Sequence, residues 1–222
     1  MVQYETFGRL IGYLGTMELI REVRVMSFQP IDSSFFQQPT LQLAHSLLGM
    51  LLVKETEVGT ASGWIVETEA YMGPNDRAAH SFGNRRTTRT EVMFGPPGYV
   101  YTYVMHTHCL VNVVSGEVGE PEAVLIRALE PCTGKELMYK RRGEDKKEQE
   151  LTNGPGKLTK ALGIEKGDYG RAFFEKPLFI AEGKKVKSVA SGPRIGIPNS
   201  REARDYPWRL WIEGNRFVSK TK

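Results

Sequence analysis

Residues 64–81, which read WIVETEAYMGPNDRAAHS, constrain this chain more than any other stretch. The first half alternates as a β-strand does, which places four side chains on one side of the strand: Ile65, Glu67, Glu69 and Tyr71. The Gly-Pro-Asn-Asp that follows predicts a turn, after which the chain can bring His80 back toward that side. Carboxylates, a phenol and an imidazole around one turn predict a pocket for acid–base chemistry on a flat ligand. A plain strand with two solvated glutamates is the alternative, and Glu67 alone fits it well.

Further motifs follow this stretch in a fixed order. They are SFF…LV within 34–53, MF and PPG within 93–98, Tyr-x-Tyr at 101–103, VLIRALEP at 124–131, NGPGKL at 153–158, RIGI at 194–197 and PWR at 207–209. With VETEAY and AAHS, this order resembles the methylpurine (alkyladenine, 3-methyladenine) DNA glycosylases from residue 34 to about 218. The resemblance implies a monofunctional glycosylase that flips an alkylated or deaminated purine from duplex DNA, hydrolyses its N-glycosidic bond and leaves an abasic site for base excision repair.

Two other functions stay open beside that one. A hydrolase of nucleosides or small N-glycosides could also use paired glutamates, and a non-catalytic nucleic-acid-binding domain could share the fold. The pocket strands contain no lysine, so Schiff-base chemistry and strand cleavage are not supported.

Glu69 and Arg127 are the predicted catalytic residues. A carboxylate beside C1′ can deprotonate water and stabilise an oxocarbenium-like transition state, and the resemblance assigns this role to Glu69. Arg127 interrupts the apolar run 123–129 and therefore needs an anion. It either positions the water with Glu69, as the resemblance implies, or forms a structural salt bridge to Glu67 or Glu130. We expect Glu67 to be structural or to pair with a cation.

Tyr71, His80, Tyr103 and Asn112 are the predicted substrate-binding residues. A flipped purine must be stacked and hydrogen-bonded again, which Tyr71, Tyr103 and His80 could do. The resemblance implies that Asn112 crowds the 2-amino group of normal guanine. The alternatives are cross-strand aromatic packing for the tyrosines, a structural hydrogen bond for His80, and a turn-forming role for Asn112.

The predicted DNA contacts are spread over three segments. The net charge is +4 with a pI of about 9.0, and Arg85, Arg86 and Arg89 form a basic loop suited to phosphates. Lys157 could hold a phosphate at a helix start. The Tyr-Gly wedge that the resemblance implies is missing after Tyr-x-Tyr, so we expect Met105 or His106 to fill the gap that a flipped base leaves, unless another loop supplies the wedge. We favour His106 because its ring is planar.

The element pattern predicts a single α+β domain built on a curved, mainly antiparallel β-sheet with a few short helices. The expected strands are 50–54, 64–71, 99–105, 123–129, 174–181, 189–197 and 208–213. The expected helices are 41–48, 133–142 and 156–162, with a helical turn at 90–94. We expect residues 31–222 to form the glycosylase domain that the resemblance implies. We expect residues 1–30 to be an extension that is either flexible or a misannotated start, with translation beginning at Met26.

Composition and cysteine content narrow the setting. The 222 residues are 40% hydrophobic and 25% charged, without an apolar run near the roughly 20 residues that cross a bilayer. Cys109 and Cys132 make no disulfide framework. His106, His108 and Cys109 lack a second cluster with zinc-like spacing, so neither metal nor cofactor is expected. We expect a monomer that acts on double-stranded DNA containing damaged purines, without a membrane partner, in a bacterial cytoplasm at the nucleoid.

Overall fold

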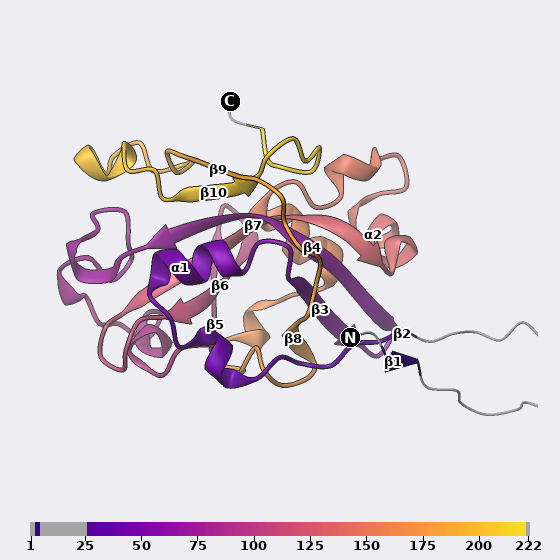
Figure 1. The fold of residues 1–222 in the computed structure, drawn as a ribbon, viewed down its shortest axis with the longest axis horizontal. Helices are drawn as coiled ribbons and strands as arrows, with labels where there is room; N and C mark the ends of the chain where they lie inside the picture. Colours follow the sequence, from indigo (N-terminus) through magenta and orange to yellow (C-terminus); the bar gives the residue numbers. More distant parts are fainter. Residues whose placement is uncertain (1–2, 5–25, 221–222) are drawn as a thin grey trace, which may run out of the picture.

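The computed structural model describes residues 3–4 and 26–220. In that part of the chain, eight antiparallel strands form one sheet, and β1 pairs with β2 in a separate two-stranded sheet (Figure 1). The predicted α+β fold on a curved antiparallel sheet is therefore confirmed. The expectation of a misannotated or flexible start falls on residues 1–30, of which 1–2 and 5–25 lie outside the described residues.

Strands alternate with short helices and turns along the described residues. The strands are β1 (Gln3–Tyr4), β2 (Met26–Ser27), β3 (Leu51–Thr56), β4 (Gly59–Tyr71), β5 (Val100–Met105), β6 (His108–Ser115), β7 (Glu122–Thr133), β8 (Leu178–Ala181), β9 (Val189–Gly192) and β10 (Arg209–Ile212). The helices are α1 (Thr40–Ser46), α2 (Lys135–Arg142) and α3 (Pro155–Leu162), with short 3-10 turns at Ser33–Phe36, Gly73–Asn75, Phe82–Asn84, Glu91–Phe94, Glu148–Glu150, Lys166–Asp168 and Arg201–Arg204.

β4 is the organising strand of the sheet. It pairs with β7 along most of its 13 residues, while its first half pairs with β3 and its second half with β10. Figure 1 shows β4 and β7 running together across the molecule, with β10 and β9 along one edge. This change of partner halfway along β4 brings the late segments of the chain beside the VETEAY residues.

A β-bulge interrupts the predicted alternation of side chains along β4. The pairing with β7 shifts register between Ile65 and Glu67, so the bulge adds one residue to β4. Ile65 therefore joins the main core, whereas Val66 packs against Ala128 and Phe217. The expectation that Ile65 shares a side with Glu67 is wrong, because the extra residue reverses the alternation at that point.

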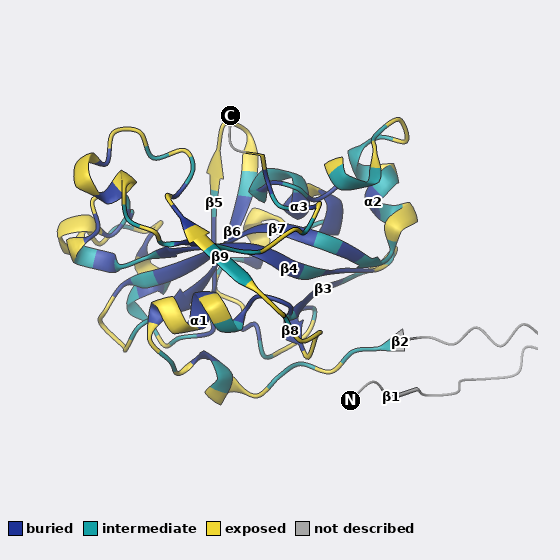
Figure 2. Ribbon diagram, turned by 45° about the horizontal axis from the view of Figure 1, so that its top comes forward, coloured by how far each residue is buried: buried dark blue, intermediate teal, exposed yellow. Residues whose placement is uncertain are grey.

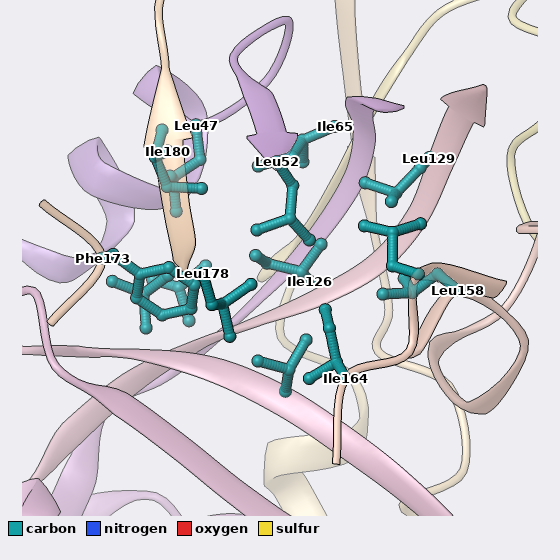
Figure 3. Close-up of a cluster of buried hydrophobic side chains, with 14 of the residues drawn as sticks. Leu47, Leu52, Ile65, Ile126, Leu129, Leu158, Ile164, Phe173, Leu178 and Ile180 are labelled. Carbon is teal, nitrogen blue, oxygen red and sulfur yellow. The ribbon is translucent and has the colours of Figure 1, made fainter. Parts of the chain in front are cut away.

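The main hydrophobic core lies on one face of the sheet and includes side chains of α1, α2 and α3. Figure 3 shows part of this core, in which Leu52 of β3, Ile126 of β7 and Leu158 of α3 lie together. In β7, Val124 and Ile126 belong to this core, while Ala123, Leu125 and Arg127 alternate onto the opposite face. Figure 2 shows the sheet as the most buried layer of the molecule. One face of the sheet thus builds stability, and the other is available for a pocket.

Several strands differ in extent from the sequence prediction; β4 begins at Gly59 and β7 ends at Thr133, so both are longer than expected. β8 begins only at Leu178 because Pro177 precedes it, and β9 ends at Gly192 because Pro193 has no N–H for a sheet ladder. The sequence pattern does not predict β6 at all. Its run Leu110–Val114 is apolar on both faces apart from one asparagine, so no clear period marks it.

Candidate active site

A pocket of about 440 Å³ opens on the sheet face opposite the main core. It lies between the strand residues of β5, β6 and β7, the turn after β4 and the segment after β9. Its lining comprises Tyr71, Ala78, His80, Met93, Tyr101, Tyr103, Met105, Leu110, Asn112, Ala123, Leu125, Arg127, Pro155, Ile195, Gly196, Ile197, Pro198, Asn199 and Ser200. Its volume and mostly apolar walls suit one small flat ligand.

The structure brings all four predicted substrate-binding residues, Tyr71, His80, Tyr103 and Asn112, onto this pocket. Asn112 lies in β6 directly across from Tyr101, and its Nδ2 donates a hydrogen bond to the Tyr101 carbonyl at 3.0 Å. The interpretation of Asn112 as a turn former is therefore wrong. Its amide is buried and fixed in orientation.

His80 is held by aromatic neighbours. Its Nδ1 lies 2.7 Å from the Tyr101 hydroxyl, and its ring meets the Tyr103 ring edge-on with centroids 4.6 Å apart. Burial, together with the nearby positive charges of Arg89 and Arg85, lowers the pKa of His80 to about 4. The imidazole is therefore neutral at pH 7 and can offer one donor and one acceptor.

Glu69 lies immediately behind the pocket wall, with a side chain that is 0% exposed. Its Oε1 accepts a hydrogen bond from the Ile195 N–H at 2.7 Å, and its Oε2 accepts one from the Tyr71 hydroxyl at 2.9 Å. Arg127 Nη1 lies 3.3 Å from Oε2. Burial raises the pKa of Glu69, against the opposing effects of Arg127, Ile195 and Tyr71. All three of these partners line the pocket, although Glu69 itself does not.

Glu67 anchors a buried charge cluster beside Glu69. Its Oε1 accepts from Arg127 Nε at 3.0 Å and from Arg209 Nε at 2.7 Å. The N–H and hydroxyl of Ser219 each donate to its carboxylate at 2.7 Å. The prediction that Glu67 pairs with a cation is confirmed. Arg127 forms the structural salt bridge to Glu67 and also contacts Glu69, while its role in positioning water stays a prediction.

Glu130, the other partner considered for Arg127, is engaged elsewhere. Its Oε2 accepts hydrogen bonds from Lys184 Nζ at 2.7 Å and from Asn215 Nδ2 at 2.8 Å. Glu67 is thus the carboxylate that forms the structural salt bridge to Arg127.

Sequence reasoning missed Arg194, Arg209 and Asp76. Arg194 is fully buried in an ion pair with Asp76, and Arg209 completes the cluster at Glu67. The signal that identified Arg127, an arginine inside an apolar segment, would also have found Arg209 in PWRLWI and Arg194 in PRIGI. Both motifs entered the prediction only through the resemblance.

The predicted DNA-contact residues occupy different environments. Arg85 and Arg89 are exposed, whereas Arg86 is exposed but paired with Glu91. Lys157, at the start of α3, is half-buried and donates to Asn153 Oδ1 at 2.8 Å. These positions leave Arg85 and Arg89 better placed than Arg86 or Lys157 to meet a phosphate.

The two wedge candidates sit at the end of the β5–β6 hairpin. Met105 lines the pocket and is 45% exposed. His106 is exposed in the turn with a positive φ of 47°. Met105 therefore borders the ligand space, and His106 is at the tip of the hairpin.

The described residues offer neither a metal-binding cluster nor a membrane-spanning helix. No group of three or more His, Cys, Asp or Glu side chains is arranged there to hold a metal ion. No helix in that part of the chain combines the length and the apolar character needed to span a bilayer.

Comparison with known proteins gives consistent results. The profile of the family described as Methylpurine-DNA glycosylase (MPG) matches residues 34–216. A Bacillus licheniformis protein named "Putative 3-methyladenine DNA glycosylase" is 65% identical over 192 residues, which cover 86% of this chain and 97% of the relative. Proteins of the same name from Bacillus subtilis and Listeria monocytogenes serovar 1/2a are 62% and 46% identical, over 86% and 85% of this chain and 97% and 92% of their own lengths. The chain therefore belongs to the methylpurine-DNA glycosylases, enzymes that hydrolyse N-glycosyl bonds in DNA.

Proposed function

We propose that this enzyme flips an alkylated or deaminated purine from duplex DNA into the pocket and hydrolyses its N-glycosidic bond with water activated by Glu69. The observation that carries this proposal is the buried carboxylate of Glu69 behind a purine-sized pocket, bonded to three residues of its wall. The product is an abasic site, because no lysine among the described residues lines the pocket to form a Schiff base.

The hydrogen bonding of Glu69 supports a role as general base. An ionised carboxylate accepts at about four lone-pair positions. Ile195 and Tyr71 each donate one hydrogen bond and Arg127 adds an ion pair, which leaves at least one position for water. Glu67, by contrast, is surrounded by Arg127, Arg209 and Ser219. Water at the pocket wall beside Arg127 would lose its proton to Glu69 as positive charge develops on the sugar.

Recognition of the base would come from four residues of the pocket lining. Tyr71 and Tyr103 both line the pocket and provide ring faces for a purine. The Asn112 amide, fixed by the Tyr101 carbonyl, would crowd the 2-amino group that guanine carries and hypoxanthine lacks. Neutral His80 would hydrogen-bond the purine edge with its free nitrogen.

Incubation with duplexes that each carry one lesion tests the proposal, followed by alkaline cleavage at abasic sites. The lesions are 3-methyladenine, 7-methylguanine, hypoxanthine and ethenoadenine. We expect lesion-dependent cleavage in duplex DNA and none of the free nucleosides. Release of base from nucleosides would instead support a nucleoside hydrolase, and specific binding without release would support a non-catalytic domain.

Monomeric action on the bacterial nucleoid is part of the same proposal. Flipping one base places one pocket on one lesion, so a single copy of the chain suffices. Sedimentation with and without a lesion duplex would check this, with one protein per duplex as the expected stoichiometry.

A further inference from the structure

Arg194 forms a fully buried ion pair beside the active site. Its Nη1 and Nη2 meet the two carboxylate oxygens of Asp76 at 2.5 and 2.8 Å, and both side chains are 0% exposed. The same nitrogens donate to the carbonyls of Ala70 at 2.9 Å and Ala203 at 3.1 Å. The Arg194 guanidinium thus donates to four acceptor atoms, which fixes the position of the backbone around residue 194.

The guanidinium of Arg194 also supports an aromatic wall of the pocket. Its central carbon lies 4.7 Å from the centroid of Tyr71 and 5.0 Å from that of Trp208. Arg194 does not line the pocket, so it packs on the side of Tyr71 away from the ligand space. The cation thereby holds the ring in place while leaving its other face for a base.

Asp76 organises the turn that carries the purine-recognition residues. Its carboxylate accepts hydrogen bonds from the N–H groups of Met72 at 3.1 Å and Ala78 at 3.0 Å. Ala78 and His80 then line the pocket. This carboxylate therefore helps to hold the histidine turn in position.

Ile195 links the same ion pair to the catalytic carboxylate. Its N–H, one peptide beyond Arg194, donates to Glu69 Oε1 at 2.7 Å, and the side chain lines the pocket. Movement of Arg194 would therefore lengthen or misalign this hydrogen bond to Glu69.

We propose that Asp76 and Arg194 are positioning residues for the reaction: their ion pair holds the Ile195 amide on Glu69 and the His80 turn at a fixed distance from each other. This inference rests on the proposed role of Glu69 as general base. The group that activates water and the residues that bind the purine are then held by the same buried ion pair. A base that is bound out of position would therefore lie too far from the activated water to react. Stability alone does not require a buried ion pair here, because well-packed apolar residues often stabilise a fold as well as a buried ion pair does. The link to Glu69 gives this pair a reason beyond stability.

The test compares Asp76→Asn with a matched control, Asp168→Asn. Asp168 is also a buried aspartate that pairs with a cation, Lys54, and accepts a backbone N–H, that of Glu165 at 3.0 Å. None of the partners of Asp168 lines the pocket or contacts Glu69. Both substitutions should lower the melting temperature, so stability alone does not separate them.

Single-turnover excision of hypoxanthine from a duplex, measured across pH with enzyme in excess, separates them. Displacement of a reacting group by about 1 Å costs about 10²-fold in rate, and we expect a loss of that order for Asp76→Asn. Binding to a duplex with a tetrahydrofuran abasic analogue should change much less. Asp168→Asn should keep the wild-type rate at temperatures below its melting point.

The pH profile gives a readout that a purely structural role would not move. The Ile195 N–H favours the ionised form of Glu69 and keeps the pKa of Glu69 lower than burial alone would set it. Loosening this bond raises that pKa. The acid limb of the rate profile should therefore move to higher pH in Asp76→Asn, with the largest loss at low pH, and should stay in place in Asp168→Asn.

Identical rates and pH profiles for Asp76→Asn and Asp168→Asn would overturn the inference. If Asp76→Asn does not fold, Arg194→Lys, which keeps the charges paired but loses the fork, must show the same rate loss and acid-limb shift. Glu69→Gln separates this inference from the proposed function. Full activity of Glu69→Gln refutes Glu69 as the base, whereas an inactive Glu69→Gln beside a control-like Asp76→Asn refutes only the positioning role.

Discussion

At the scale of single residues, two glutamates on one strand have different roles because their partners differ. Glu67 is surrounded by two arginines and two donors of Ser219, so its charge serves to hold Arg127. Glu69 is equally buried but keeps acceptor capacity beside the pocket wall. The residue types and their spacing in the sequence place both glutamates on one strand. Only the tertiary partners, which come from β7, β10 and the last residues, decide which one can act on water.

Glu69→Gln should retain the fold and lesion binding but lose turnover. The amide has nearly the shape of the carboxylate but cannot accept the water proton, and removal of a general base costs about 10²–10⁴-fold in rate. Single-turnover excision of hypoxanthine checks the rate, and gel-shift titration checks binding. A near wild-type rate in this variant would exclude Glu69 as the base.

His80 should stay neutral through the physiological range. Because its pKa in the fold is about 4 rather than 6.5, the unfolded chain binds the proton more readily between these values. The contribution of neutral His80 to stability is therefore complete above pH 6.5 and is lost as the pH falls toward 4. A histidine NMR titration should give a midpoint near 4 for this ring, moving upward in Arg89→Ala. A midpoint near 6.5 would contradict the burial of the imidazole.

At the scale of elements, the β5–β6 hairpin ends at the rim of the pocket. Its two-residue turn, His106–Thr107, has positive φ at both positions, 47° and 69°, as a type I′ turn requires. Thr159 of α3 donates to the Cys109 carbonyl at 2.7 Å, and a Cβ on Gly156 would lie only 2.7 Å from His108 Cβ. Contact with α3 thus fixes where the hairpin ends and keeps Met105 at the pocket rim.

Met105→Ala should reduce the fraction of flipped base. Flipping costs a few kcal/mol, and a side chain that fills the vacated stack recovers part of it. Met105 borders the pocket and His106 does not, so the geometry favours Met105, although the planar ring favoured His106. We expect the flipping equilibrium of an ethenoadenine duplex to fall about tenfold, which is about 1.4 kcal/mol, in Met105→Ala. Fluorescence emission reports it, with His106→Ala as the matched comparison. Loss only in His106→Ala would assign the wedge to His106.

The sequence predicts the elements well where the hydrophobic periodicity is clear or where proline and glycine mark the ends of an element. Proline and glycine mark the start and end of α3, where Pro155 opens the helix and Gly163 closes it with φ of 77°. The strand β6 is not predicted because it is apolar on both faces and its turn contains no glycine or asparagine. The bulge at Val66 also left no local sign, because it depends on pairing with β7, some 60 residues away.

At the scale of the whole molecule, the sheet separates stability from chemistry. The helices and the main core occupy one face, and the pocket occupies the other, so substitutions at the pocket do not have to disturb the core. Ser219 crosses back to Glu67 near the end of the chain, and Arg209 joins it from β10. The active site therefore forms only when residues from 67 to 219 have assembled, which is why local motifs alone could not locate its ion pairs.

The exposed arginines of the molecule predict where DNA phosphates bind. Arg85 and Arg89 are exposed, form no ion pair within the described residues and lie close enough to depress the pKa of His80 at the pocket. Arg86 is paired with Glu91 instead. Each phosphate contact contributes about 0.9 to the slope of log K against log salt concentration.

Arg85→Ala with Arg89→Ala should therefore weaken binding to damaged and undamaged duplex alike, and should lower the salt slope by roughly two units. Arg86→Ala is the matched control and should change the slope much less, because its charge is already offset by Glu91. Binding isotherms between low and physiological salt measure both slopes. If the double variant keeps the wild-type slope, the phosphates meet another surface of the molecule, and if Arg86→Ala lowers the slope as much, the pair with Glu91 opens when DNA binds.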